Sequence, residues 1–278
     1  MDQDIKGRLY ICSTPIGNIE DITLRVLRIL KEVDLIAAED TRITKKLLAF
    51  YDIHNPIISF NQVNEKKVIP KLTDRLLQGK KIALVSDAGT PGIQDPGHTL
   101  IKKCIELGID YESLPGPSAL IAAAIISGLP TNDLRFLGFL PRKTGQRKKL
   151  LTDLKDEKST LIFYESPHRI TNSLKDIEDI FGSRKVALLR EITKKFEERL
   201  FGSSKEIQKE IGDKKIKGEI VLVIKGADSK SVTVTAEEIR NDLTRLLNQG
   251  LTKKDSVKKV ASTRGVPRKR VYEESLDI

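Results

Sequence analysis

The first 115 residues alternate short apolar, β-branched runs with amphipathic stretches, and this alternation restricts the possible folds more than any other feature. Predicted strands lie at 9–13, 35–38, 57–60, 81–85 and 111–114. Asp21 is expected to cap a helix that carries Leu24, Leu27 and Leu30 at helical spacing. Further helices are predicted over 67–78, where Pro70 favours a later start, and over 96–107. Alternation of this kind predicts a mainly parallel sheet with helices on both faces.

Small and polar residues follow several of the predicted strands. They form four groups, at 14–17, 39–42, 87–97 and 115–119. Because ligands of parallel α/β sheets bind beyond the carboxyl ends of the strands, these groups predict a ligand site at that edge.

A second α/β unit is predicted after a hinge near 114–118. It starts with an Ala- and Ile-rich helix over 118–126, which we expect to be buried. Further strands are predicted at 136–140, 160–164, 186–190 and 220–224, with helices at about 146–154, 169–181 and 205–211. A polar linker over 227–234 precedes an all-helical end. We therefore expect two α/β domains with mainly parallel or mixed sheets and a cleft between them, 1–115 and 116–228, and a helix-turn-helix-like segment over 235–278.

The net charge of +10 is unevenly distributed along the chain. Residues 1–140 hold 17 Lys and Arg against 17 Asp and Glu, whereas residues 141–278 hold 32 against 22. Excess positive charge in one half favours a polyanionic partner such as nucleic acid. The alternative is that the basic residues serve only solubility.

Cysteine and histidine usage argues against disulfides and metals. Cys12 and Cys104 are single and far apart, which favours a reducing, cytoplasmic location. His54, His98 and His168 fit no ligand spacing, so no metal is expected. No stretch approaches the roughly 18 apolar residues of a membrane span, and the N-terminus lacks a signal-peptide pattern, so no membrane association is expected.

The segment 86–97 has three glycines and two prolines in twelve residues and directly follows a predicted strand. Such a backbone is rigid and can lie close against a ligand. It lacks the Gly-Lys-Ser/Thr of a P-loop and the GxGxxG of a dinucleotide site. We interpret it as a ligand loop, with a purely structural turn as the alternative.

Nine short motifs occur in one order along the chain, at 14–18, 39–42, 86–91, 95–97, 115–119, 127–130, 138–141, 163–169 and 190–194. Over roughly residues 8–225 this series resembles the ribosomal RNA small subunit methyltransferase I family, which are 2′-O-methyltransferases of the tetrapyrrole-methylase superfamily. The resemblance implies S-adenosyl-L-methionine as methyl donor and a homodimer. It also implies the ribose 2′-hydroxyl of a cytidine in small-subunit (16S) ribosomal RNA as acceptor.

Carried over position by position, the resemblance implies donor contacts from three loops and one strand end. These residues are Pro15, Ile16, Asp87, Ala88, Gly89, Thr90, Pro91, Ile93, Ser118, Ala119 and Tyr164. The superfamily more often has an acidic residue where this chain has Thr90, so the ribose contact could pass to Asp87 or to backbone.

A ribose hydroxyl is a weak nucleophile, so a base or a cation that stabilises the alkoxide should help. The candidates are Glu39, Asp40, Arg42, Glu165, Glu191 and Lys194. Each has a structural alternative: Glu39 and Asp40 could cap a helix that begins at Thr41, and Glu191 and Lys194 could form an ordinary ion pair. The sequence does not choose among them.

Two basic stretches are candidates for contact with RNA phosphates. The first supplies Arg142, Lys143, Arg147 and Lys148; the second supplies Lys258, Lys259, Arg268 and Arg270. The pattern of the second stretch predicts a helix-turn-helix. The alternative is that these helices form a small cap on the fold or a dimer contact. At the level of the whole chain, the alternatives are a methyltransferase acting on a tetrapyrrole precursor and a non-catalytic nucleic-acid-binding protein.

Overall fold

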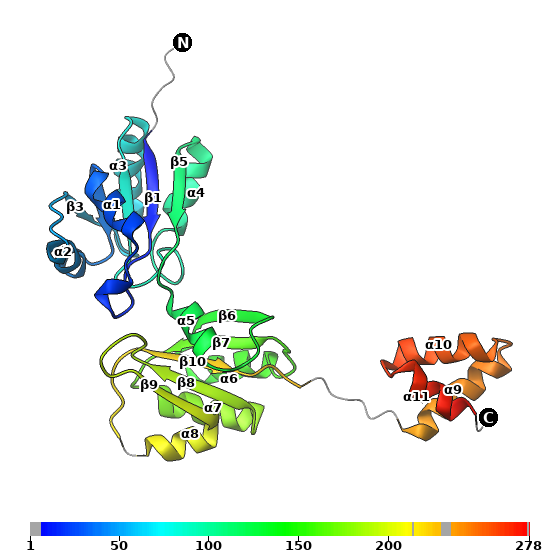
Figure 1. Ribbon diagram of the computed structural model, residues 1–278. Helices are drawn as coiled ribbons and strands as arrows, with labels where there is room; N and C mark the ends of the chain where they lie inside the picture. Colours follow the sequence, from blue (N-terminus) through cyan, green and yellow to red (C-terminus); the bar gives the residue numbers. More distant parts are fainter. Residues whose placement is uncertain (1–6, 213, 229–234, 277) are drawn as a thin grey trace, which may run out of the picture. The chain divides into compact units, whose positions relative to one another are not determined.

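The computed structural model describes residues 7–212, 214–228, 235–276 and 278. The chain divides into two compact units, Met1–Gly226 and Ala227–Ile278. The first unit contains two five-stranded sheets, and the second is helical (Figure 1).

The first sheet is parallel throughout, with the order β3-β2-β4-β1-β5. Its strands are β1 (Arg8–Cys12), β2 (Leu35–Ala38), β3 (Ile57–Ser59), β4 (Ile82–Val85) and β5 (Asp110–Leu114). All five predicted strands are confirmed. The connection after β1 runs to the far side of β4, and the connection after β4 runs to the far side of β1. The two loops therefore part at a topological switch point, where such sheets bind ligands.

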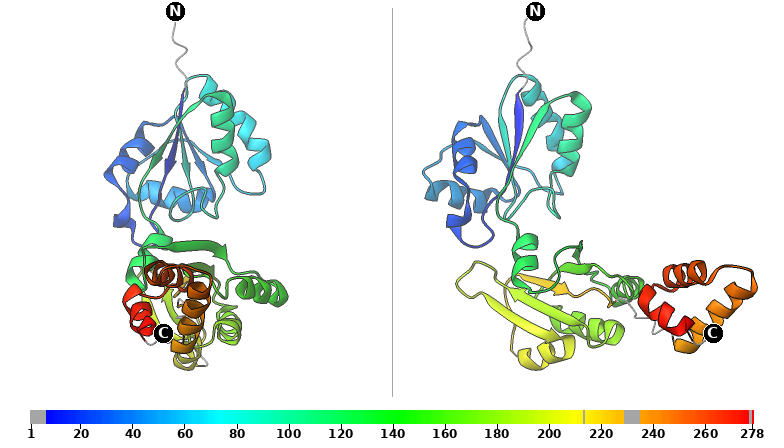
Figure 2. Two further views of the ribbon diagram at one scale, coloured as in Figure 1. Left: turned by 90° about the vertical axis from the view of Figure 1, so that its right-hand side faces the viewer. Right: turned by 45° about the vertical axis from the view of Figure 1, so that its right-hand side comes forward.

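Helices cover both faces of this sheet (Figure 2). They are α1 (Leu24–Glu32), α2 (Thr41–Phe50), α3 (Glu65–Leu77) and α4 (His98–Leu107), with a short 3-10 helix, η1 (Ile19–Asp21). Alternate strand residues point to opposite faces, so Ile11 packs with the α3 and α4 side and Cys12 with the α1 and α2 side.

Three predicted helix starts were wrong. Asp21 ends η1, and Thr23 caps α1, which leaves Leu24 86% exposed. α3 begins at Glu65, before Pro70 and not after it, because the Asn61 side chain accepts from the amide of Asn64 and starts the turn early. α4 begins at His98 because Gly97, at φ +144°, is its non-helical cap.

The second sheet is mixed and has the order β6-β7-β10-β8-β9. Its strands are β6 (Leu134–Phe139), β7 (Thr160–Glu165), β8 (Lys185–Arg190), β9 (Glu198–Ser203) and β10 (Ile220–Ile224). β6 and β7 are parallel, and the other pairs are antiparallel. β9 was not predicted: it is an edge strand of which only Leu200 is buried, so its sequence carries almost no apolar signal.

This sheet is packed between α5 (Ala119–Ile126) and the helices α6 (Thr144–Asp153), α7 (Ile170–Phe181) and α8 (Ser204–Ile211). The expectation that α5 is buried was wrong in part. Ala123 and Ala124 face the core, but Ile121 and Ile125 are 52% and 69% exposed. The helix is apolar all round, whereas one sheet covers only one of its sides.

The second unit consists of α9 (Ala236–Asn248), α10 (Lys253–Arg264) and α11 (Arg268–Ser275) around a small apolar core. The predicted helical end and its turn are confirmed, with Gly265 left-handed after α10. An ion pair of 2.6 Å between Arg264 and Asp242 joins α10 to α9. Of the predicted linker over 227–234, residues 229–234 lie outside the described residues. No helix among the described residues is long and apolar enough to cross a membrane.

Arg147, expected among the RNA-contacting cations, is buried within the first unit. Its side chain is 3% exposed and forms a 2.6 Å ion pair with Asp176 of α7, while its guanidinium also donates to the carbonyl of Pro141. The basic run is helical here, and its period turns position 147 inward. Arg147 therefore joins α6 to α7 and is not a surface cation.

Arg147→Met should lower the free energy of unfolding by about 3 kcal/mol, because the buried charge of Asp176 then has only the half-exposed Lys148, 3.4 Å away, as a partner. The double variant Arg147→Met/Asp176→Leu should recover most of that loss. Urea unfolding followed by circular dichroism measures both, with the exposed neighbour Lys149→Met as control. Equal, small losses for Arg147→Met and Lys149→Met would contradict the assignment.

Candidate functional site

A pair of reciprocal backbone hydrogen bonds joins the loops that follow β1 and β4. The amide of Thr14 donates to the carbonyl of Gly89 at 2.9 Å, and the amide of Gly89 donates back at 3.0 Å. The Thr14 hydroxyl also donates to the carbonyl of Ser86. Gly89 has φ +80°, a backbone conformation that favours glycine. We call this arrangement the Thr14–Gly89 clamp; it fixes the neighbouring side chains Ile16 and Ala88.

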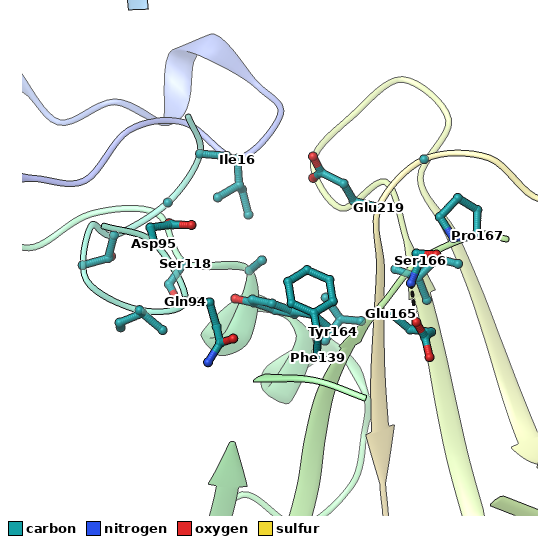
Figure 3. A pocket seen from close by; sticks show the side chains of 18 residues that line it. Ile16, Gln94, Asp95, Ser118, Phe139, Tyr164, Glu165, Ser166, Pro167 and Glu219 are labelled. Carbon is teal, nitrogen blue, oxygen red and sulfur yellow. Dashed lines mark hydrogen bonds between the residues drawn. The ribbon is translucent and has the colours of Figure 1, made fainter. Parts of the chain in front are cut away.

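The clamp borders a cavity of about 310 Å³, which we call the first cavity (Figure 3). Loops of the first sheet supply one part of its wall, and β6, β7, β10 and the start of α5 supply the rest. Eight of the predicted donor contacts line it: Ile16, Ala88, Gly89, Thr90, Ile93, Ser118, Ala119 and Tyr164. Lining residues that the prediction missed are Gln94, Asp95, Phe139, Ser166, Pro167, Gly218, Glu219, Ile220 and Val221.

The lining combines flat apolar surfaces with a few polar groups. In Figure 3 the rings of Tyr164 and Phe139 lie together in the middle of the view, and their centroids are 5.5 Å apart. Ser118 contributes a hydroxyl, and Asp95 and Glu219 contribute carboxyl groups. A largely apolar pocket with few polar groups is typical of a small-molecule site, and the carboxyl groups suit a ligand that carries positive charge.

Three predicted donor contacts do not line this cavity. Pro15 and Asp87 line a second cavity of about 380 Å³, and Pro91 lines neither. The residues around the second cavity are Thr14, Pro15, Ile16, Gly17, Ile19, Ile43, Thr44, Lys46, Leu47, Phe50, Ser86, Asp87, Ala88, Lys194 and Glu219.

Carboxyl groups gather beside the clamp. Burial, together with the nearby charges of Glu39 and Asp87, raises the pKa of Asp95 to about 7. Burial, with the charges of Asp87 and Asp40, likewise raises the pKa of Glu39 above its ordinary value. Asp95 belongs to one of the nine sequence motifs but was not selected, because only the folded chain brings Glu39 and Asp87 close to it. Among the described residues, no group of His, Cys, Asp and Glu side chains is placed to hold a metal ion.

Asp40 and Arg42 are engaged at the start of α2. The Asp40 carboxylate accepts from the amide of Arg42 at 2.8 Å and pairs with its guanidinium at 2.6 Å. These hydrogen bonds lower the pKa of Asp40 to about 2. Asp40 is therefore the N-cap of α2, which is the structural role that the sequence offered as an alternative to catalysis. The backbone amide of Asp40 donates to Asp87 Oδ1 at 2.9 Å.

Glu165 lines the first cavity, yet other groups of the chain already occupy both of its oxygens. It pairs with Arg169 at 2.5 Å and accepts from the Ser173 hydroxyl and from the amide of Ser166. Its side chain thus holds the turn between β7 and α7 in place.

Glu191 and Lys194 lie in the loop between β8 and β9 and form an ion pair of 2.9 Å. Burial opposes both charges, but hydrogen bonds between them and with Glu219 leave the pKa of Glu191 lowered and that of Lys194 raised. Glu191 and Thr193 have φ of +53° and +67°, which is strained for residues other than glycine. The Thr193 hydroxyl accepts from the amide of Asn18, so this loop rests against the loop after β1.

The predicted RNA-contacting residues differ in their surroundings. Arg142 and Lys143 are exposed, whereas Lys148 pairs with Asp179 at 3.1 Å. In the second unit, Lys258 and Arg268 line a groove between α10 and α11, while Lys259 and Arg270 are exposed outside it. The groove also contains Lys253, Lys254, Val257 and Tyr272, which the prediction did not select.

The chain belongs to the tetrapyrrole-methylase class of proteins. The family model Tetrapyrrole (Corrin/Porphyrin) Methylases matches residues 8–208. A cobalt-precorrin-4 methyltransferase of cobalamin biosynthesis has the same fold, with a TM-score of 0.61 at 18% identity over 78% of this chain and 94% of that chain. The predicted fold, two α/β sheets of the tetrapyrrole-methylase type, is confirmed.

Closer relatives narrow the class. Ribosomal RNA small subunit methyltransferase I of Halalkalibacterium halodurans is 44% identical over 277 residues, 97% of this chain and 95% of the relative. This chain therefore belongs to the ribosomal RNA small subunit methyltransferase I family, as the motifs predicted. The protein of the same name from Thermotoga maritima is 47% identical over 222 residues, which are 80% of this chain and 100% of the relative. The length of that relative is close to that of the first unit alone and is too short for both units.

The raised pKa of Asp95 predicts a pH-dependent cost to stability. The folded protein holds the proton up to about pH 7, whereas the unfolded chain releases it near the ordinary value of 3.8, so stability falls as the pH rises between these values. Asp95→Asn removes this cost, and its stabilising effect should be larger at pH 8 than at pH 5. Urea unfolding at both pH values tests this, with Asp74→Asn on the exposed side of α3 as control. An Asp95→Asn effect that is equal at both pH values would contradict it.

Proposed function

We propose that this protein transfers a methyl group from S-adenosyl-L-methionine to the ribose 2′-hydroxyl of a cytidine in small-subunit (16S) ribosomal RNA. The observation that carries the proposal is the first cavity at the switch point of the parallel sheet, in a chain of the ribosomal RNA small subunit methyltransferase I family. When bound, S-adenosyl-L-methionine supplies a methyl group on a positively charged sulfur.

The residues around the first cavity suit this donor. Tyr164 and Phe139 offer aromatic surface to an adenine, and Ser118 offers a hydroxyl for hydrogen bonding. The carboxylate of Glu219, together with that of Asp95 once its proton is lost near pH 7, favours a cation. Because methyl transfer removes the positive charge of the sulfur, a mostly apolar wall favours the reaction.

Transfer to a hydroxyl depends mainly on orientation, and the charged candidates serve it by positioning. We propose that Asp40 and Arg42 fix the start of α2, and that Glu165 fixes the turn after β7. The Glu191–Lys194 pair holds its loop against Gly17. A side chain at position 17 would place its Cβ only 2.9 Å from the carbonyl oxygen of Ile192, so the close approach of the two loops requires glycine there. Glu39 lines neither cavity, but its carboxylate accepts from the amide of Asp87 at 3.3 Å and burial raises its pKa, so we propose it as the candidate for exchange of a proton.

We propose that the second unit is an RNA-binding arm. Its groove between α10 and α11 places Lys253, Lys254, Lys258 and Arg268 around Tyr272, which is 55% exposed. Cations beside an exposed aromatic ring are typical of surfaces that bind the backbone and stack the bases of single-stranded RNA. The exposed Arg142 and Lys143 are proposed as further phosphate contacts.

We further propose a cytoplasmic homodimer built from domains 1–115 and 116–228 with the arm 235–278. The exposed Ile121 and Ile125 of α5 support a covered interface, since large apolar side chains cost free energy in water. Sedimentation equilibrium, with Ile125→Lys for comparison, tests the oligomeric state.

Donor binding and methyl transfer are tested in sequence. Calorimetry with S-adenosyl-L-methionine should give one site per chain. If the donor does not bind, methyl transfer to RNA and methyl transfer to a tetrapyrrole are both excluded, and a non-catalytic nucleic-acid-binding protein is left. Labelled donor incubated with small ribosomal subunits should then place the label on RNA. Label that stays off subunits and bare RNA, but reaches a tetrapyrrole precursor, would replace the proposed acceptor.

The groove of the second unit predicts a split among its cations. Lys258→Gln/Arg268→Gln should weaken RNA binding and leave donor affinity unchanged. The slope of the logarithm of RNA affinity against the logarithm of salt concentration should become shallower by roughly 0.7 for each phosphate that is no longer neutralised. Lys259→Gln/Lys269→Gln, which removes the same charge outside the groove, is the matched control. Equal effects of the two pairs would assign the binding to net charge, and an equal loss of donor affinity would assign the arm to the fold.

A further inference from the structure

The second cavity shares part of its wall with the first. Ile16, Ala88 and Glu219 line both. Two of these three residues lie beside the Thr14–Gly89 clamp, whose hydrogen bonds fix the boundary between the cavities. A molecule in the second cavity would therefore lie directly beside a donor in the first.

One face of α2 forms the outer part of the second cavity. Ile43, Lys46, Leu47 and Phe50 recur at helical spacing and all line it. Phe50 is 63% exposed, and its ring meets Tyr51 edge-on at 5.0 Å. The Tyr51 hydroxyl donates to the carbonyl of Ile19 at 2.7 Å, which ties this end of α2 to the loop after β1. The exposed ring is thus carried by a fixed backbone and leaves surface free for a planar group.

The polar groups of the second cavity differ from those of the first. Lys46 is exposed and forms no ion pair among the described residues, so its ammonium is available to an anion. Asp87 accepts from the amide of Asp40 through Oδ1, and Oδ2 has no hydrogen-bond partner within the described chain. The cavity therefore combines an aromatic ring, a cation and a carboxylate acceptor beside the shared wall.

We propose that the second cavity binds the acceptor nucleotide, with its base on Phe50, a phosphate near Lys46 and a ribose hydroxyl toward Asp87. This inference rests on the proposed function and adds to it the place of the RNA. Bases stack on aromatic side chains, and lysine binds phosphate as a point charge. Asp87, implied by resemblance as a donor contact, is reassigned to the acceptor.

Neighbouring residues of α2 provide matched controls. Lys45, next to Lys46, lines a separate hollow with Ala49 and His54 that shares no residue with the first cavity. Lys45→Gln therefore removes the same charge from the same helix on another side. Phe201 of β9 is 54% exposed and lines neither cavity, so Phe201→Ala is the control for Phe50→Ala.

The experiment measures donor affinity by calorimetry and initial rates of methyl transfer against the concentration of unmethylated small ribosomal subunits. Phe50→Ala should raise the KM for subunits about 5-fold or more. Lys46→Gln should also raise it and should lower its dependence on salt. Both variants should keep the donor affinity of the unchanged protein, and both controls should keep its KM.

The possible results distinguish failure of the proposed function from failure of the acceptor site alone. If the unchanged protein places no label on RNA, the proposed function fails, and the acceptor site fails with it. If it labels RNA while Phe50→Ala and Lys46→Gln match their controls, only the acceptor site is overturned. A loss of donor affinity as large as the rise in KM would assign the second cavity to the donor and would also overturn the inference.

Discussion

The two hydrogen bonds between Thr14 and Gly89 are the contact on which the arrangement of the site depends. The parallel sheet sends the loops after β1 and β4 in opposite directions, so without a cross-link these loops would be free to separate. One residue of each loop pairs with the other, and the glycine of the pair has a left-handed conformation. This pairing holds the two loops together at the edge of the first cavity. The backbone, and not a charged side chain, thus defines where a ligand can lie.

Charge is arranged around this backbone frame in a way that separates two tasks. The carboxyl groups of Glu39, Asp87 and Asp95 gather beside the clamp, where burial, together with neighbouring carboxylates, raises the pKa of each, and where they favour a cationic ligand. The groove cations of the second unit lie in a separate compact body. A negatively charged centre suits the donor, while basic surface elsewhere suits a polyanion.

Sequence patterns were sufficient for features that depend on local order. Four strands of the first sheet, β1 to β4, are short and mainly apolar, and the loops after the strands follow from the sheet type. The loops that line the first cavity could therefore be predicted, although only about half of its lining residues were selected. β9 could not, because an edge strand with one buried residue has little pattern. Arg147 and Asp95 were misjudged or missed for a related reason: the partner Asp176 and the neighbours Glu39 and Asp87 are distant in sequence.

The wall that the two cavities share at Ile16, Ala88 and Glu219 has a thermodynamic consequence. Any adjustment of these side chains to a molecule on one side changes the surface offered to the other side. Binding on the two sides is then linked, and the linkage is reciprocal: the factor by which one occupant alters the affinity of the second equals the factor in the opposite direction. A chain built in this way can favour an order of arrival and departure without any movement of its domains.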